Sequence, residues 1–172
     1  MAQSSIGRNG ENWCIDMFEI TIVEEKPQLV AGMRWCGHYK DIAKMVPALF
    51  EYVRSQGAII AGPPLCIMHE MSMEEAKIAD EAGNADIEVC IPIGERIPEN
   101  DEIKCYDLSG GKMAKIIHKG PYEACGPVYE GLFAWMEENG HKIAGPIREA
   151  SLNDPRDVPP EEILTAIYAP IS

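Results

Sequence analysis

Residues 120–149, GPYEACGPVYEGLFAWMEENGHKIAGPIRE, repeat the pattern of residues 37–66, GHYKDIAKMVPALFEYVRSQGAIIAGPPLC. The match extends without a gap over residues 18–70 and 101–153, so each residue corresponds to the one 83 positions later. The glycines, the Ala-Gly-Pro turn and the apolar helix positions agree. A repeat of this length is too long for a solenoid unit. It indicates a duplicated half-domain, with a ligand site in the cleft between the two halves.

The composition is that of a globular protein, with 46% hydrophobic and 25% charged residues in a chain of 172. This length suits one domain built from two halves that share a core. No apolar run approaches the roughly 20 residues that span a bilayer. The polar stretch Met1–Asn12 lacks the apolar core of a secretory signal. We therefore expect a disordered tail over residues 1–12, a single domain over residues 13–172, and a cytoplasmic location without membrane contact.

The formal net charge is −13. Such an acidic surface repels nucleic-acid phosphates, which argues against a direct nucleic-acid partner. The negative surface potential also attracts cations. The alternative interpretation is that the charge serves solubility alone. Neither the six cysteines nor the four histidines show the close spacing of a zinc or iron–sulfur site. We expect no metal and no cofactor, and thiols that stay reduced.

Each half reads as strand, strand, helix, strand, strand, over about residues 18–93 and 101–171. Alternating apolar residues predict the strands and a three- to four-residue apolar spacing predicts the helices. Short connections suggest that each half opens with a hairpin. Pro47 falls inside the first helical stripe, so we expect the helix to begin near it. Ser72 and Glu75 form a capping-box pattern, which predicts a short extra helix. The predicted strands are 18–22, 29–36, 65–69 and 86–93 in the first half and 112–119, 148–152 and 164–171 in the second.

These elements predict an α+β fold. We expect a pseudo-twofold tandem of two β-β-α-β-β modules, with a largely antiparallel sheet and the two main helices on one face. The other face is left to bind something or to be covered.

Glu149 is the most informative single residue. It lies in a predicted strand, on the same face as Ile147 and Ser151, and its counterpart in the first half is Cys66. A carboxylate at a sheet position whose counterpart is apolar suggests a binding site. A salt bridge with Arg148, or a solvated edge position, is the alternative interpretation.

Aromatic residues recur at corresponding places in the two halves. Core packing accounts best for Phe50, Phe133 and Trp135, and it competes with a ligand role for the others. An aromatic cleft with one buried carboxylate suits a flat or aliphatic cation. The candidate ligand-binding residues are Glu149, Tyr122, Trp135, Tyr168, Trp35, Tyr39, Met68 and Cys66.

Several motifs together resemble the GyrI-like proteins, the effector-binding domain that AraC- and MerR-type bacterial regulators also carry. The second half carries Gly120-Pro121-Tyr122, residues 129–135, Ala144-Gly145-Pro146-Ile147-Arg148-Glu149 and residues 152–165. The first half carries Val30-Ala31-Gly32-Met33-Arg34 and Ala61-Gly62-Pro63-Pro64. The resemblance covers nearly the whole chain from residue 18. Met68 departs from it, because relatives often carry an aromatic there.

The resemblance implies a central cleft for small, often cationic and hydrophobic, molecules, with the family's central glutamate at Glu149. It also implies a stand-alone member, because no helix-turn-helix segment precedes the domain. Our first hypothesis is a protein that binds or sequesters such a molecule without turning it over. The alternative is a hydrolase of cyclopropane-bearing alkylating natural products, with Glu149 and Tyr122 as catalytic residues. A weaker alternative is an acidic inhibitor of a topoisomerase. The sequence names neither the ligand nor the oligomeric state.

Overall fold

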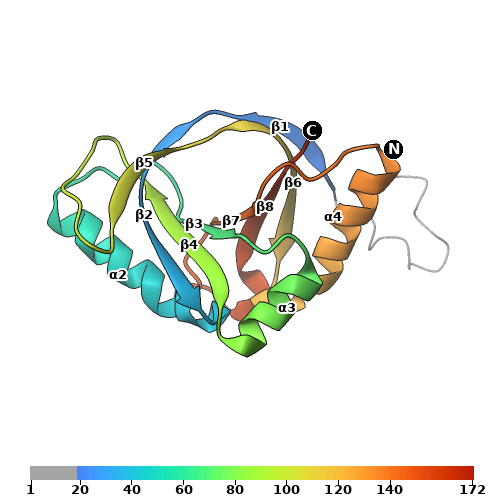
Figure 1. The fold of residues 1–172 in the computed structure, drawn as a ribbon, viewed down its shortest axis with the longest axis horizontal. Coiled ribbons are helices and arrows are strands. Elements are labelled where there is room, and N and C mark those ends of the chain that lie inside the picture. The colour runs from blue at the N-terminus through green and yellow to red at the C-terminus, as the bar shows by residue number, and fades with distance from the viewer. Residues whose placement is uncertain (1–18) are drawn as a thin grey trace.

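The computed structural model describes residues 19–172, and the predicted tail over residues 1–12 lies outside this range. Figure 1 shows how the elements are arranged. The first half contains β1 (Thr21–Glu25), β2 (Gln28–Gly37), α2 (Ile42–Ser55), β3 (Leu65–Met68), α3 (Met73–Ala82) and β4 (Ala85–Pro92). The second half contains β5 (Lys104–Leu108), β6 (Gly111–Lys119), α4 (Gly126–Glu138), β7 (Ile147–Ser151) and β8 (Leu164–Pro170). Short 3-10 turns lie at Tyr39–Asp41, Tyr122–Ala124 and Pro160–Glu162.

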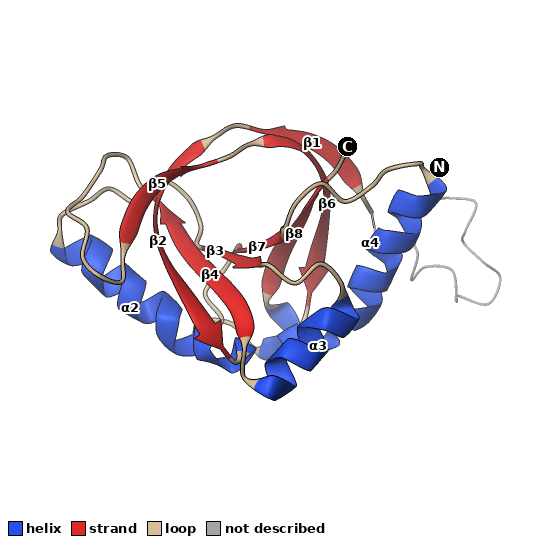
Figure 2. Cartoon of the chain, viewed as in Figure 1, coloured by secondary structure: helices blue, strands red, loops and turns tan. Residues whose placement is uncertain are grey.

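The eight strands form one sheet in the order β1-β6-β8-β7-β3-β4-β2-β5. Every strand pair is antiparallel, which confirms the predicted α+β class. The strands of the two halves meet at the centre, where β3 pairs with β7. The sheet curls, and the three helices lie outside the curl (Figures 1 and 2).

The predicted hairpins are wrong. β1 pairs with β6, and β5 pairs with β2, so each half lends its first strand to the other half. A tight hairpin needs residues with positive φ at its turn. The Lys26-Pro27 connection cannot supply them, because proline fixes φ near −65° and Lys26 does not adopt a positive φ. The first connection therefore crosses into the other half. The connection through Gly110-Gly111 crosses as well, although its glycines would permit a hairpin.

The two crossing connections touch each other. A Cβ atom at Gly110, between β5 and β6, would lie 2.1 Å from the carbonyl oxygen of Glu25, at the end of β1. Glycine is thus required here by close backbone approach.

Helix α2 begins at Ile42, one turn before Pro47, rather than near Pro47 as expected. The Tyr39–Asp41 turn precedes it as a separate element. Proline removes the hydrogen bond to the carbonyl of Ala43, and this is tolerated because Ala43 is exposed and water can serve that carbonyl. The capping prediction for α3 is confirmed, since the Ser72 hydroxyl accepts from the Glu75 N–H at 3.1 Å.

The core has two layers, one on each face of the sheet. Helices α2 and α4 both pack on one face, which we call the helix face. In the first half α2 places Met45, Leu49 and Val53 on β4, and in the second α4 places Val128, Leu132 and Met136 on β6 and β8. The opposite face, called the inner face, is covered by side chains from the sheet itself: Val30, Leu65, Ile67, Cys90, Leu108, Ala150 and Ala166.

Candidate functional site

Strand β7 places Glu149 on the helix face. Ile147 belongs to the helix-face core and Ala150 to the inner-face core, and side chains alternate along a strand. Glu149 therefore points toward the helices. Arg148 points the other way, where its Nη2 donates to the carbonyl of Ser109 at 2.7 Å. The two neighbours thus form no salt bridge.

The Glu149 carboxylate is partly buried and lies at the centre of the sheet, opposite Cys66 of β3 and beside Ile167 of β8. The hydroxyl of Tyr129, from α4, donates a hydrogen bond to its Oε2. Among residues 19–172 no lysine, arginine or histidine forms an ion pair with it. Burial raises the pKa of Glu149, while the Tyr129 hydrogen bond and the nearby His118 lower it by less. The site is an acid held in an apolar setting without a cationic partner.

The carboxylate of Glu149 interacts electrostatically with five further side chains: Tyr129, Cys66, Cys125, Tyr122 and His118. We call these residues together with Glu149 the Glu149 cluster. Burial raises the pKa of the Cys125 thiol to about 11, and the Glu149 charge adds to the effect. The same two causes raise the pKa values of Cys66, Tyr122 and Tyr129. These thiols and phenols therefore stay neutral near pH 7, so Glu149 is the acid of the cluster.

Polar residues form the neighbouring row of the helix face. Thr165 of β8 lies opposite His118 of β6 and Ser151 of β7. His118 is 6% exposed, and its Nε2 contacts the carbonyl oxygen of Pro121 at 2.9 Å. Thr165 is 3% exposed, and its Oγ1 is enclosed without a hydrogen-bond partner among the described residues. A buried hydroxyl without a partner is unusual and suggests that a bound molecule or water satisfies it.

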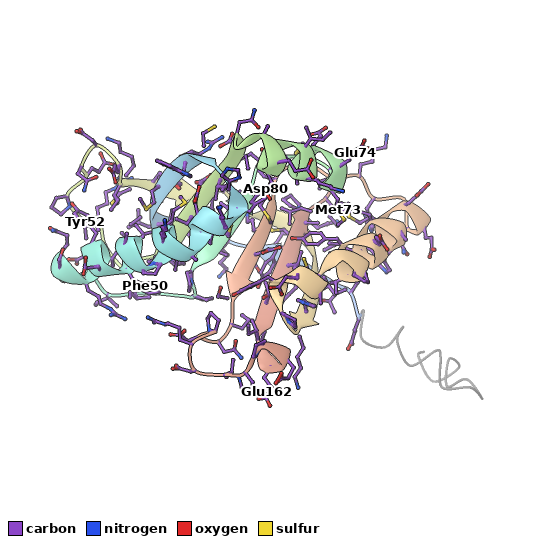
Figure 3. All side chains as sticks on the ribbon, turned by 90° about the horizontal axis from the view of Figure 1, so that it is seen from below. Phe50, Tyr52, Met73, Glu74, Asp80 and Glu162 are labelled. Carbon is purple, nitrogen blue, oxygen red and sulfur yellow. The ribbon has the colours of Figure 1, made fainter. Side chains whose placement is uncertain are left out.

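Tyr39 adjoins the cluster from the first half, and the Cys66 thiol is among its electrostatic neighbours. Its hydroxyl donates to Glu70, whose other carboxylate oxygen accepts from the Asp86 N–H at 2.8 Å. Its backbone N–H donates to the Asp80 carboxylate at 2.7 Å. Asp80 lies on α3 (Figure 3). Burial and the Glu70 hydrogen bond raise the pKa of Tyr39. This tyrosine therefore connects α3 to the sheet beside the cluster.

The structure brings some of the predicted residues together and separates others. Glu149, Cys66 and Tyr122 lie in the cluster, with Tyr39 adjoining it. Met68 lies one step along the same face of β3 and packs on the second-half core.

Trp35, Trp135 and Tyr168 are placed elsewhere. Trp35 is 52% exposed, and its indole N–H donates to Asp41 at 2.9 Å. Trp135 stacks on His141, with ring centres 5.4 Å apart. Tyr168 lies on the inner face, away from Glu149. The register explains the position of Tyr168. Glu149 pairs with Ile167, so Tyr168, the next residue of β8, must point to the other face.

Five members of the Glu149 cluster and its polar row were not among the predicted ligand-binding residues: Tyr129, Cys125, His118, Ser151 and Thr165. Tyr129 carried a usable signal. It falls among the apolar positions of α4, and a buried tyrosine needs a partner for its hydroxyl. His118 carried a weaker signal, because it differs from its counterpart Trp35 in the other half. Thr165 and Cys125 carried none, because their proximity depends on strand pairing and on the docking of α4.

Two other findings bear on the class of site. Within residues 19–172 no group of three or more histidine, cysteine or acidic residues is arranged to hold a metal ion. None of the helices in that range is both long and apolar enough to cross a lipid bilayer.

Comparison with known proteins gives one family and several structures of the same fold. The sequence profile of the GyrI-like small molecule binding domain matches residues 18–172. The C-terminal domain of EcmrR is 20% identical with a TM-score of 0.79, over 90% of this chain and 97% of that one. A hydrolase encoded by lin2189 from Listeria innocua is 13% identical with a TM-score of 0.65, over 90% and 92%.

The structure of SAV2435 bound to tetraphenylphosphonium is 12% identical with a TM-score of 0.54, over 90% of this chain and 94% of that one. At such identities these likenesses show the fold. No curated protein sequence matches the chain.

Proposed function

The chain belongs to the GyrI-like small-molecule-binding family, and we propose that it binds a hydrophobic organic cation at the Glu149 cluster. The observation that carries this proposal is that Glu149 is partly buried and forms no ion pair within residues 19–172. A partly buried carboxylate without a cationic partner is unfavourable when ionised. A bound cation would supply the missing charge.

The surroundings of Glu149 favour a large, weakly hydrated cation over a metal ion. Phenol rings such as that of Tyr122, which is 44% exposed, offer π faces that attract organic cations. The cluster's neutral thiols add polarisable apolar surface. The net charge of −13 raises the encounter rate with cations from solution. SAV2435, a protein of the same fold, has been seen with tetraphenylphosphonium, and this ion is therefore a suitable first probe.

The test compares tetraphenylphosphonium with its neutral analogue triphenylphosphine oxide by isothermal titration. Glu149→Gln should weaken binding of the cation at least tenfold, or about 1.4 kcal/mol, and leave binding of the neutral analogue nearly unchanged. Glu162→Gln is the matched control, because it removes one charge from an exposed side chain at the outer edge of the molecule (Figure 3). Equal loss of cation binding in both variants would show that the net charge of the protein, and not the position of Glu149, causes the loss. No binding by the wild type would refute the proposal for this class of cation.

A hydrolase of cyclopropane-bearing alkylating compounds is the second candidate. The raised pKa of Glu149 favours it, because a carboxylate with increased proton affinity is a stronger general base. Glu149 would accept a proton from water as the water oxygen bonds to a ring carbon. The breaking C–C bond would send its electrons to a conjugated carbonyl oxygen, which Tyr122 would protonate. The proton held by Glu149 would then return to the Tyr122 phenolate through water, so that the substrate gains one water and both residues are restored. Mass spectrometry should then show the substrate plus one water over many turnovers, with turnover lost in Glu149→Gln. Stoichiometric binding without that product would exclude this role.

A further inference from the structure

A hollow lies on the inner face, on the opposite side of the sheet from Glu149. It is a cavity of about 130 Å³. Its floor is buried and includes Leu65, Met113, Ala150 and Arg148, while the more exposed Glu25 and Gln28 form its rim. Arg148 and Glu149 are adjacent in β7, so their side chains point to opposite faces of the sheet. The strand therefore supplies a cation to this cavity and an acid to the helix face.

Arg148 carries a charge, is largely buried, and uses only one of its three guanidinium nitrogens in hydrogen bonds within residues 19–172. It is 9% exposed, and one of its nitrogens, Nη2, donates to Ser109. Among residues 19–172 its Nε and Nη1 have no hydrogen-bond partner, and no carboxylate lies within ion-pair distance. Neither nitrogen is among the fully enclosed side-chain atoms without a partner in that range, so each keeps some contact with solvent. Arg148 lines the cavity.

A second cation, Lys115, lies near Arg148. Tyr168 of β8 pairs with Arg148 on one side and Lys115 of β6 on the other, and the Lys115 ammonium lies 5.4 Å from the centre of the tyrosine ring. Glu88 lies two strands from Arg148, across Ile67. Its carboxylate accepts from Tyr106 and contacts His69 at 2.8 Å. Its charge, like that of Glu25, still favours the charged form of Arg148, but neither carboxylate lies within ion-pair distance of the guanidinium.

Glu25 is the acidic group on the cavity itself. Glu25 lies at the rim, whereas the charge of a bound anion would lie at the floor beside Arg148. Its repulsion should therefore weaken binding of a dianion more than binding of a monoanion.

We propose that this cavity binds a small aliphatic monocarboxylate. A guanidinium presents its N–H donors in a planar fork that matches a carboxylate, and Ser109 uses neither Nε nor Nη1 of Arg148. The volume equals about four times the roughly 30 Å³ share of one water, which fits a molecule of a few heavy atoms. The hydrocarbon end would contact Leu65, Met113 and Ala150.

Arg148 could instead serve only to hold the Ser109 carbonyl beside the crossing connections. The two roles differ in what a ligand does to the wild-type protein. We would titrate ¹⁵N-labelled protein with sodium butyrate at constant ionic strength and follow the amide signals. The proposal expects saturable shifts at Leu65, Met113 and Ala150, with Tyr122 and Tyr129 unaffected. Absence of saturable shifts at millimolar butyrate would overturn it.

Butyramide, a neutral molecule of the same shape, should bind at least tenfold more weakly than butyrate. Equal binding of the two would show that Arg148 plays no part in recognition. Inorganic phosphate that shifts the same signals as strongly as butyrate would overturn the carboxylate assignment. These comparisons use the wild-type chain, so they hold even where a variant fails to fold.

The variants then assign the residues. Arg148→Gln should abolish saturation by butyrate, and Lys115→Gln should weaken it only a few-fold. Glu149→Gln should bind butyrate as the wild type does, so loss of cation binding and loss of carboxylate binding are separate outcomes. Unchanged butyrate binding in a folded Arg148→Gln protein would contradict the proposal.

Discussion

Cys66 of β3 and Glu149 of β7 face each other across the central strand pair, although 83 residues separate them in the chain. They occupy corresponding positions of the sequence repeat. An acid in both places would put two like charges side by side and raise the pKa of one of them strongly. The thiol at Cys66 avoids this, and its own pKa is raised by burial and by the Glu149 charge. The site therefore carries one acidic group.

Replacement of that acid should change how stability depends on pH. Burial raises the pKa of Glu149 in the folded protein above the unfolded value of about 4.3, so the folded state holds the extra proton between the two values. Wild-type stability should consequently fall as pH rises through this window. Glu149→Gln should remove that fall and be more stable above it, by on the order of 1 kcal/mol. Urea denaturation across the window would measure this, and parallel curves for the two proteins would contradict it.

Loss of the Tyr129 hydroxyl should raise the pKa of Glu149 further. The hydroxyl donates to the carboxylate and so favours its ionised form. Tyr129→Phe should also cost about 1 kcal/mol of stability, the usual net worth of one hydrogen bond. Carboxyl ¹³C NMR titration gives the pKa directly. Tyr52→Phe is the control, because its hydroxyl donates to the Pro98 carbonyl at a remote exposed site and should leave the Glu149 titration unchanged.

Binding of an organic cation should strengthen with pH. The cation favours ionised Glu149, whose pKa is raised in the free protein, so binding below that pKa must release a proton. Titration calorimetry in buffers of different ionisation enthalpy would detect the proton. In Glu149→Gln the residual affinity should be flat over the same pH range. Proton release that persists in this variant would assign the effect to another group.

The crossing of the first strands should depend on Gly110. A Cβ there would lie 2.1 Å from the Glu25 carbonyl oxygen, and backbone atoms cannot give way as a flexible side chain can. Gly110→Ala should therefore destabilise the fold by about 2 kcal/mol or more. Gly94→Ala is the matched control, since a Cβ there would meet the Ile59 side chain at 3.5 Å, an ordinary van der Waals distance. It should change stability by less than about 0.5 kcal/mol. Similar losses in both variants, measured by urea denaturation, would reject the crossing as the cause.

Much of the fold follows from local patterns in the chain. The apolar periodicity of α2 and α4, the Ser72 cap and the alternation in β7 each depend on residues a few positions apart. Such patterns predict elements, and the repeat predicts that they occur twice. They also place Glu149 on a definite face of its own strand, because side chains alternate within any strand. The GyrI-like resemblance rests on the same linear motifs.

The tertiary structure decided which distant residues meet. Strand exchange between the halves, the position of Tyr168 on the inner face and the contact of Tyr129 with Glu149 all depend on register and helix docking. A shift of one residue in register would move every side chain of a strand to the opposite face, and no local pattern in β8 states which partner residue it will face. The sequence by itself thus determined the elements, their repetition and the central acid. The pairing energy of the whole sheet decided what surrounds that acid and placed Arg148 on the other side.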